Sequence, residues 1–279
     1  GLFNGADAAI NAIFNSFGDR DEIFLTTNPT FGYYSPCSEI QGMRKITCTY
    51  EGDNFCFPIK QFQEKIIKFK PKLIFICNPN NPTGTILSAK EIIKLANLNK
   101  KSLIVVDELY EKFNGDSLLP VIDFEKIKNI VIIQSLSKTA GLAGLRIGFA
   151  FGHKSIIQYI NKVTGPYDVN SFAVTAALAA LNDKSYIDNY VSEVKKARVL
   201  IEKKFESTNI RKHFGGGNYF LIWPNKNSEI LTRQMREKGI LIREMKNKKD
   251  IENSIRVSIG TQEQMSLFWS TYKELDHNN

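Results

Sequence analysis

The chain has 279 residues, of which 43% are hydrophobic and 24% charged, proportions that are ordinary for a globular protein with a substantial core. The formal net charge is +8, but the lysines are scattered over many amphipathic segments and form no basic run interleaved with aromatics, which argues against nucleic-acid binding. No apolar run approaches the length needed to cross a bilayer, so we expect no membrane association.

The first half of the chain alternates short apolar runs with amphipathic helical stretches. Helices are predicted over Ala6–Phe17, Ile59–Phe69 and Ala89–Asn99. Strands are predicted over Glu22–Thr26, Lys45–Thr49, Leu73–Cys77, Leu103–Val106, Ile130–Gln134 and Arg146–Phe151. This alternation, with nearly continuous apolar strands, predicts an α/β fold: a large domain with a mostly parallel sheet flanked by helices. In such sheets, ligands bind outside the carboxyl ends of the strands.

After residue 151 the pattern changes to longer helices and an α+β arrangement. The expected elements are helices over Ile156–Val163, Ser171–Leu181, Ser185–Phe205, Ser228–Lys238 and Gln262–Leu275, and strands over Tyr219–Trp223, Ile240–Arg243 and Ser254–Ile259. We therefore expect a large domain over residues 1–189 and a smaller α+β C-terminal domain over 190–279. Because Gly1–Gly5 leads directly into a helix, we also expect that an N-terminal segment is missing.

Cysteine and histidine usage gives no sign of a disulfide framework or a metal site. The four cysteines show no CxxC spacing, and the three histidines lie far apart without a carboxylate or cysteine at ligand spacing. We therefore predict no metal ligands and a reducing, cytoplasmic location.

A lysine follows the strand predicted over Ile130–Gln134, in Ser135-Leu136-Ser137-Lys138. A lysine in a partly desolvated crevice has a lowered pKa and becomes a nucleophile toward carbonyl carbon, which is what a Schiff base requires. Flanking hydroxyls could bind an anion. Taken alone, this motif is more often an ordinary turn with a solvated lysine than a functional site.

Asp107 stands at the end of the strand predicted over Leu103–Val106. A buried carboxylate is costly unless it is paired, so Asp107 either caps a helix, forms an ion pair, or serves a ligand. As a ligand group it could pair with a pyridinium nitrogen and keep that ring protonated. Tyr110 follows closely enough to face the same ligand.

Two further motifs lie where the topology predicts a site. The turn from Asn78 to Gly84 follows the strand Leu73–Cys77 and is rich in proline and asparagine, which makes it either a simple rigid turn or a rigid mount for an amide. Asn4-Gly5-Ala6-Asp7 begins a helix, whose free N–H groups and dipole favour a phosphate.

In this order and spacing, the motifs NPNNPTG, DELY and SLSKTAGLAGLRIG resemble those of the fold-type I pyridoxal-phosphate enzymes. The segments PYDVNSFA, ILIRE and IRVSIGT make the histidinol-phosphate aminotransferase family the most similar one. The resemblance covers essentially the whole chain. It implies a pyridoxal 5'-phosphate cofactor, a homodimer, and a leading segment, absent here, that carries a tyrosine reaching into the partner subunit's site.

The resemblance also implies a role for individual residues. Lys138 would hold the cofactor and shuttle a proton, Asp107 would pair with the pyridinium nitrogen, and Phe31 would stack on the ring. Asn81 and Tyr110 would hydrogen-bond the phenolic oxygen. The cofactor phosphate would lie against Ala6, Asp7, Ser135, Ser137 and Arg146. Arg256 would bind the amino-acid carboxylate, and Arg243 a substrate phosphate; the alternative for Arg243 is a surface arginine at a strand end.

Three functions follow from these observations. The first is transamination between L-glutamate or 2-oxoglutarate and a small phosphorylated substrate, with histidinol phosphate and imidazole-acetol phosphate as the default pair, or another phosphorylated ketone. The second is decarboxylation of a phosphorylated amino acid such as phosphothreonine or phosphoserine, which would use the same cofactor and arginines. The third is a regulatory domain that binds nucleic acid, against which the absence of a basic domain argues.

Overall fold

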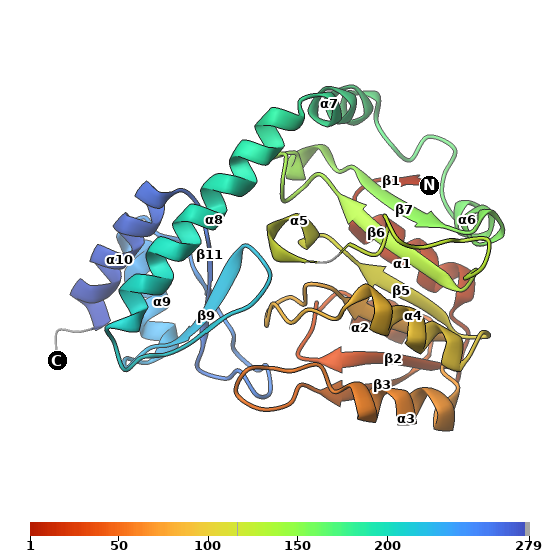
Figure 1. Cartoon of the computed structure of the whole chain (residues 1–279), viewed down its shortest axis with the longest axis horizontal. Coiled ribbons are helices and arrows are strands. Elements are labelled where there is room, and N and C mark those ends of the chain that lie inside the picture. The colour runs from red at the N-terminus through yellow and green to blue at the C-terminus, as the bar shows by residue number, and fades with distance from the viewer. Residues whose placement is uncertain (116, 277–279) are drawn as a thin grey trace.

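In the computed structural model, which describes residues 1–115 and 117–276, the chain forms two sheets. The larger has seven strands in the order β1-β7-β6-β5-β4-β2-β3, and the smaller has four in the order β10-β11-β9-β8. Figure 1 shows the sheets side by side, with the long helix α8 (Lys184–Glu206) running from α7 (Ser171–Asn182) to the smaller sheet. Residue 190, where the second domain is predicted to begin, lies inside α8, and this division stays a prediction.

The large sheet is mostly parallel, as the sequence predicts. The pairs β2–β3, β2–β4, β4–β5 and β5–β6 are parallel, whereas β7 and β1 are added antiparallel at one edge. Its strands are β1 (Leu2–Phe3), β2 (Ile23–Asn28), β3 (Arg44–Thr49), β4 (Leu73–Cys77), β5 (Leu103–Asp107), β6 (Ile130–Ser135) and β7 (Gly148–Gly152).

Helices cover both faces of this sheet because every residue of the central strands β4 and β5 is buried. Successive side chains of a strand point to opposite faces, so both faces need cover. Phe75 of β4 packs on one face, where it stacks on Phe14 of α1 at 4.7 Å between ring centroids. Ile74 points to the other face, into a core with Phe62 of α3 and Ile92 of α4. The helices of the large-sheet region are α1 (Ala6–Phe17), α2 (Tyr34–Ile40), α3 (Ile59–Phe69), α4 (Ala89–Leu98), α5 (Glu111–Asn114) and α6 (Lys154–Asn161).

The small sheet is antiparallel and packs against the helices α8, α9 and α10. Its core contains Phe205 of α8, Phe220 of β9 and Phe268 of α10. The remaining elements are the 3-10 turn Ala143–Leu145, β8 (Arg211–Phe214), β9 (Tyr219–Trp223), α9 (Ser228–Glu237), β10 (Arg243–Glu244), β11 (Ile255–Ser258) and α10 (Gln262–Asp276).

The two sheets meet through backbone at the turn that follows β4. A Cβ on Gly84 would lie 2.6 Å from the Cα of Gly215, in the hairpin turn between β8 and β9. The N–H of Gly216 donates to the carbonyl of Gly84 at 2.6 Å, and His213 Nε2 lies 2.7 Å from the carbonyl of Thr83. This contact fixes the turn that carries the predicted site residue Asn81.

Several elements differ from the sequence predictions. The elements β1, α2 and β8 are not predicted, since each is too short to show a hydrophobic period. The strand predicted from Arg146 begins at Gly148, because Arg146 adopts a left-handed conformation with φ of 55° and turns the chain. The strand predicted over Ile240–Arg243 is β10, which begins at Arg243.

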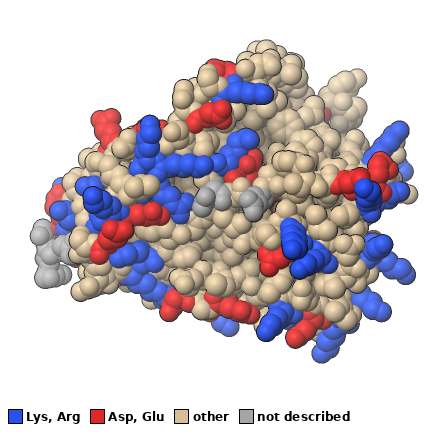
Figure 2. Space-filling view, viewed as in Figure 1, with Lys and Arg blue, Asp and Glu red and all other residues tan. Residues whose placement is uncertain are grey.

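Charged side chains of both signs are interspersed on the face of the molecule shown in Figure 2. No helix in the described part of the chain is both long and apolar enough to span a membrane. All four cysteines are free, and three of them are buried.

Candidate active site

A cavity of about 140 Å³ opens at the carboxyl edge of the large sheet, where β4, β5 and β6 end. Its position agrees with the rule for parallel sheets. Nine of the ten residues predicted to hold a cofactor line it, together with Cys77, Leu109 and Ala143. The nine are Ala6, Asp7, Phe31, Asn81, Asp107, Tyr110, Ser137, Lys138 and Arg146.

Lys138 enters this cavity from the loop after β6. Its ammonium Nζ lies 5.6 Å from the ring centroid of Tyr110, close enough for a cation–π contact. Burial lowers the pKa of Lys138, and the charge of Arg256 lowers it further, whereas Asp7 and Asp107 act in the opposite direction. A lysine with a lowered pKa has a larger neutral fraction near neutral pH, and the neutral amine is the nucleophile.

Asp107 is the last residue of β5 and is only 2% exposed. Its Oδ2 accepts a hydrogen bond from the hydroxyl of Tyr34 at 2.6 Å, and its Oδ1 accepts one from the N–H of Leu109 at 3.2 Å. Burial raises the pKa of Asp107 to about 6, although the hydrogen bond from Tyr34 lowers it in part. A carboxylate so placed is suited to a cationic or N–H-bearing ligand group.

Tyr110 and Asn81 line the cavity on the side of the small sheet. The Tyr110 ring meets that of Tyr219 edge to face, at 5.1 Å between centroids, and burial raises the pKa of Tyr110. Asn81 Oδ1 accepts from Nη1 of Arg256 at 2.6 Å. The hydroxyl of Tyr219 donates to the carbonyl of Asn80 at 2.6 Å, so residues of β9 and β11 hold this turn in place.

The N-terminus of α1 forms the opposite end of the cavity. Gly5 precedes the helix with φ of 84° and offers no side-chain cap, so the first N–H groups face the cavity beside Arg146. A Cβ on Gly5 would lie 2.4 Å from Nη2 of Arg146. Arg146 also forms an ion pair with Asp7, with 2.8 Å between Nη2 and Oδ2. This end therefore combines a cation with free N–H donors.

Ser135 is the predicted cofactor residue that does not line the cavity. It ends β6, is largely buried, and its hydroxyl oxygen accepts from the N–H of Ser137 at 3.3 Å. The hydroxyl of Ser135 therefore shapes the loop that carries Ser137 and Lys138. Phe31 does line the cavity, and it packs edge to face on Tyr34 at 5.6 Å between ring centroids.

A second cavity, of about 340 Å³, lies beside the first and shares Phe31 and Asn81 with it. It contains both predicted substrate arginines. Arg243 of β10 and Arg256 of β11 are directly opposite each other in the antiparallel register, so two like charges are held side by side. Nε of Arg256 is buried and has no hydrogen-bond partner among the described residues. An anionic ligand would offset the repulsion between the two arginines and accept a hydrogen bond from this Nε.

The polar contributions of Tyr34 and Lys248 are not among the sequence predictions, and Gly5 appears there only as part of the phosphate motif Asn4-Gly5-Ala6-Asp7. Nothing in Phe31-Gly32-Tyr33-Tyr34 distinguishes the tyrosine that reaches Asp107 from its neighbour. Lys248 lines the second cavity, but in Lys246-Asn247-Lys248-Lys249 nothing in the sequence distinguishes it from the neighbouring lysines. Gly5 does carry a signal, since glycine before a helix permits a positive φ.

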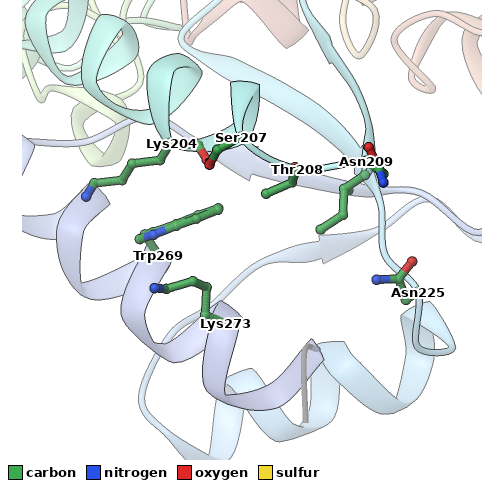
Figure 3. Close-up of a pocket in the computed structure, with 8 residues that line it drawn as sticks. Lys204, Ser207, Thr208, Asn209, Asn225, Trp269 and Lys273 are labelled. Carbon is green, nitrogen blue, oxygen red and sulfur yellow. The ribbon is translucent and has the colours of Figure 1, made fainter. Parts of the chain in front are cut away.

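The molecule has a further hollow away from the predicted site residues. Figure 3 shows an open groove between the end of α8 and α10, where Trp269 lies between Lys204 and Lys273; no predicted site residue lines it. Among residues 1–115 and 117–276, no group of three or more His, Cys, Asp or Glu side chains is placed to hold a metal ion. His277 lies outside the described residues.

Solved aminotransferases share this fold. The chain matches the histidinol-phosphate aminotransferase of Clostridium acetobutylicum with a TM-score of 0.89 and 26% identity, covering 100% of this chain and 84% of that one. The L-threonine-O-3-phosphate decarboxylase of Porphyromonas gingivalis matches with a TM-score of 0.81 and 24% identity, covering 98% of this chain and 82% of that one. The second likeness shows the fold alone.

The model of the family described as Aminotransferase class I and II matches residues 2–269. The chain therefore belongs to this family and is a pyridoxal-phosphate-dependent aminotransferase. It is 30% identical to a histidinol-phosphate aminotransferase of Caldanaerobacter subterraneus over 98% of this chain and 76% of the relative. It is also 31% identical to a dihydroxyacetone phosphate transaminase of Campylobacter jejuni over 95% of this chain and 72% of that one.

Proposed function

We propose that the first cavity holds pyridoxal phosphate, with Lys138 as the residue that carries it covalently. The observation that supports this most directly is the set of three groups that line one cavity. Lys138 is an amine with a lowered pKa, Asp107 is a buried carboxylate, and the α1 N-terminus with Arg146 is a site for an anion. These three groups fit an aldehyde, a ring nitrogen and a phosphate, respectively.

When bound, the cofactor supplies an electron sink that makes the bonds of the substrate's alpha carbon labile. The protein supplies the rest. Asp107 would hold the ring nitrogen protonated, and Asn81 and Tyr110 would donate hydrogen bonds to the ring oxygen. The amine of Lys138 would act as a general base that takes a proton from the substrate alpha carbon. It would then act as a general acid that delivers this proton to C4′ of the cofactor. Phe31 would cover one ring face.

The two arginines of the second cavity would orient the substrates. Nε of Arg256 is buried and has no hydrogen-bond partner in the part of the chain that the structure describes, while Nη1 bonds Asn81. A carboxylate next to the cofactor would complete the hydrogen bonds of this guanidinium. Arg243 would bind the phosphate of the second substrate. We therefore propose L-glutamate and 2-oxoglutarate as one substrate pair, and histidinol phosphate with imidazole-acetol phosphate as the other.

A smaller phosphorylated ketone is the second candidate acceptor. The relative from Campylobacter jejuni, described as a dihydroxyacetone phosphate transaminase, is as similar to this chain as the histidinol-phosphate aminotransferases are. A decarboxylase of a phosphorylated amino acid would use the same residues. The likeness to the Porphyromonas gingivalis enzyme concerns the fold only.

A substrate screen tests the proposed function. Purified protein loaded with pyridoxal phosphate is incubated with L-glutamate and then offered imidazole-acetol phosphate or dihydroxyacetone phosphate. The aminotransferase should convert its yellow cofactor to the colourless pyridoxamine form and then aminate one acceptor. A protein that keeps its yellow absorbance with glutamate is not a glutamate aminotransferase. The Lys138→Ala variant should lack that absorbance from the start.

We also propose a cytoplasmic homodimer. Its supporting feature is α7, together with the loop before it, where apolar side chains face outward: Tyr167 is 94% exposed and Phe172 81%. Leu178 and Leu181 on the same helix are exposed as well. Several exposed large apolar side chains on one helix and the loop before it are a feature that protein interfaces share.

A further inference from the structure

The second cavity has an excess of positive charge. Arg243, Lys248 and Arg256 line it, and among the lining residues that the structure describes there is no aspartate or glutamate. The cross-strand pairing of Arg243 with Arg256 already places two cations side by side, which is destabilising unless an anion lies between or beside them. A third cation increases that repulsion. The cavity is therefore suited to a ligand with more than one negative charge.

Lys248 is held in this cavity by a hydrogen bond to the large-sheet region. It belongs to the loop that joins β10 to β11 and is half-buried. Its Nζ donates to the carbonyl of Thr30 at 3.3 Å, in the loop that precedes Phe31. Burial lowers the pKa of Lys248, and the charges of Arg243 and Arg256 lower it further. The ammonium therefore lies against the large-sheet loop and within range of both arginine charges.

The three cations divide between the two ends of the cavity. Arg256 bonds Asn81 and lowers the pKa of Lys138, which places its guanidinium at the end next to the first cavity. Arg243 is exposed and lies within charge range of Lys248, so these two cations remain for a second anionic group. A carboxylate needs one cation, whereas a phosphate monoester carries a charge of about −1.5 to −2 at pH 7 and is matched by two.

We propose that Lys248 and Arg243 together form a subsite for a dianionic phosphate monoester, which leaves Arg256 for the carboxylate of the amino donor. This assignment rests on the proposed function and adds Lys248 to it as a binding residue. Arginine offers a planar fork to the phosphate oxygens, and lysine adds a point charge with rotatable donors.

Calorimetric titration of the cofactor-loaded protein with inorganic phosphate, at constant ionic strength and pH 8, tests the subsite. The Lys248→Met variant keeps the length of the side chain and removes its charge, so its affinity for phosphate should fall about tenfold. Lys249→Met is the matched control, because Lys249 is exposed on the same loop and does not line the cavity. It should bind phosphate as the wild type does. Lys248→Arg should recover most of the affinity.

Equal phosphate affinities in Lys248→Met and Lys249→Met would overturn the proposal. A wild type that binds no phosphate at 50 mM would overturn it as well, because a two-cation site should have a dissociation constant of roughly 1 mM. Unfolding temperatures of all variants check that each is folded, and Lys248→Arg decides the question if Lys248→Met is not. Conversion of the cofactor by L-glutamate is recorded separately. A wild type that fails there contradicts the proposal of L-glutamate as amino donor, while the titration still decides the role of Lys248.

Discussion

Asp107 illustrates how a single residue of the site works against the stability of the fold. The side chain is 2% exposed, and the hydrogen bonds from Tyr34 and Leu109 offset only part of the cost of burying its charge, so its pKa rises to about 6 from a usual value of 3.8. The folded protein then binds more protons at Asp107 than the unfolded chain does between about pH 4 and 6. The free energy of unfolding therefore falls as the pH rises through that window, and the charged Asp107 destabilises the folded protein above it.

We expect Asp107→Asn to stabilise the cofactor-free protein at high pH. Asparagine still accepts a hydrogen bond from Tyr34 but carries no charge, so the gain should be on the order of 2–3 kcal/mol at pH 8 and well under 1 kcal/mol near pH 4. Urea unfolding of both proteins at the two pH values measures this difference. A gain that is the same at both pH values would show that the charge of Asp107 is not its cause. With pyridoxal phosphate added, the wild type should gain more stability than the variant.

At the scale of elements, the start of α1 and the turn at Arg146 bring two distant segments together at the proposed phosphate site. Gly5 has φ of 84°, and its missing Cβ leaves room for the Arg146 guanidinium. Arg146 itself is left-handed, with φ of 55°. The approach of the Arg146 guanidinium to the start of α1 depends on glycine at position 5.

Gly5→Ala should therefore weaken the binding of pyridoxal phosphate at least tenfold, because the new Cβ displaces the guanidinium and strains the backbone. Titration of the cofactor-free protein, followed by absorbance, measures the affinity. Gly144→Ala serves as the control, since a Cβ there meets nothing within 4 Å. If both variants bind alike, the phosphate does not lie between α1 and Arg146.

Elements with a long hydrophobic period were predictable from the sequence, and those set by tertiary contacts were not. The strands β4 and β5 are buried on both faces and read as continuous apolar runs. By contrast, β1 has two residues and exists through its pairing with β7. The first residue of β7 also depends on the left-handed turn at Arg146, which non-glycine residues seldom adopt.

The candidate site follows the same division. Lys138 and Asp107 were predictable because they stand at the carboxyl ends of obvious strands, where parallel sheets bind ligands. The contribution of Tyr34 depends on a hydrogen bond across the sheet edge to Asp107, and that of Lys248 on a loop that reaches Thr30. Sequence spacing contains no information about either contact.

At the scale of the whole molecule, the outward-facing apolar side chains of α7 predict self-association. Phe172→Glu places a charge on this surface and should shift the protein toward a monomer of 31.7 kDa, with the cofactor affinity measured alongside. Light scattering after gel filtration gives the mass. Leu241→Glu, which alters another exposed apolar residue in the small-sheet region, should leave the mass unchanged. A wild type that is itself monomeric at all concentrations would contradict the homodimer.

The contact between Gly84 and Gly215 has a consequence for how this protein can change over evolutionary time. Each glycine excludes a side chain on the other, because a Cβ on either one would overlap backbone atoms of its partner. Neither position can therefore accept another residue while the two turns remain this close. Residues that line the second cavity are free of that constraint, so this lining can change by single substitutions while the spacing of the two sheets is inherited unaltered.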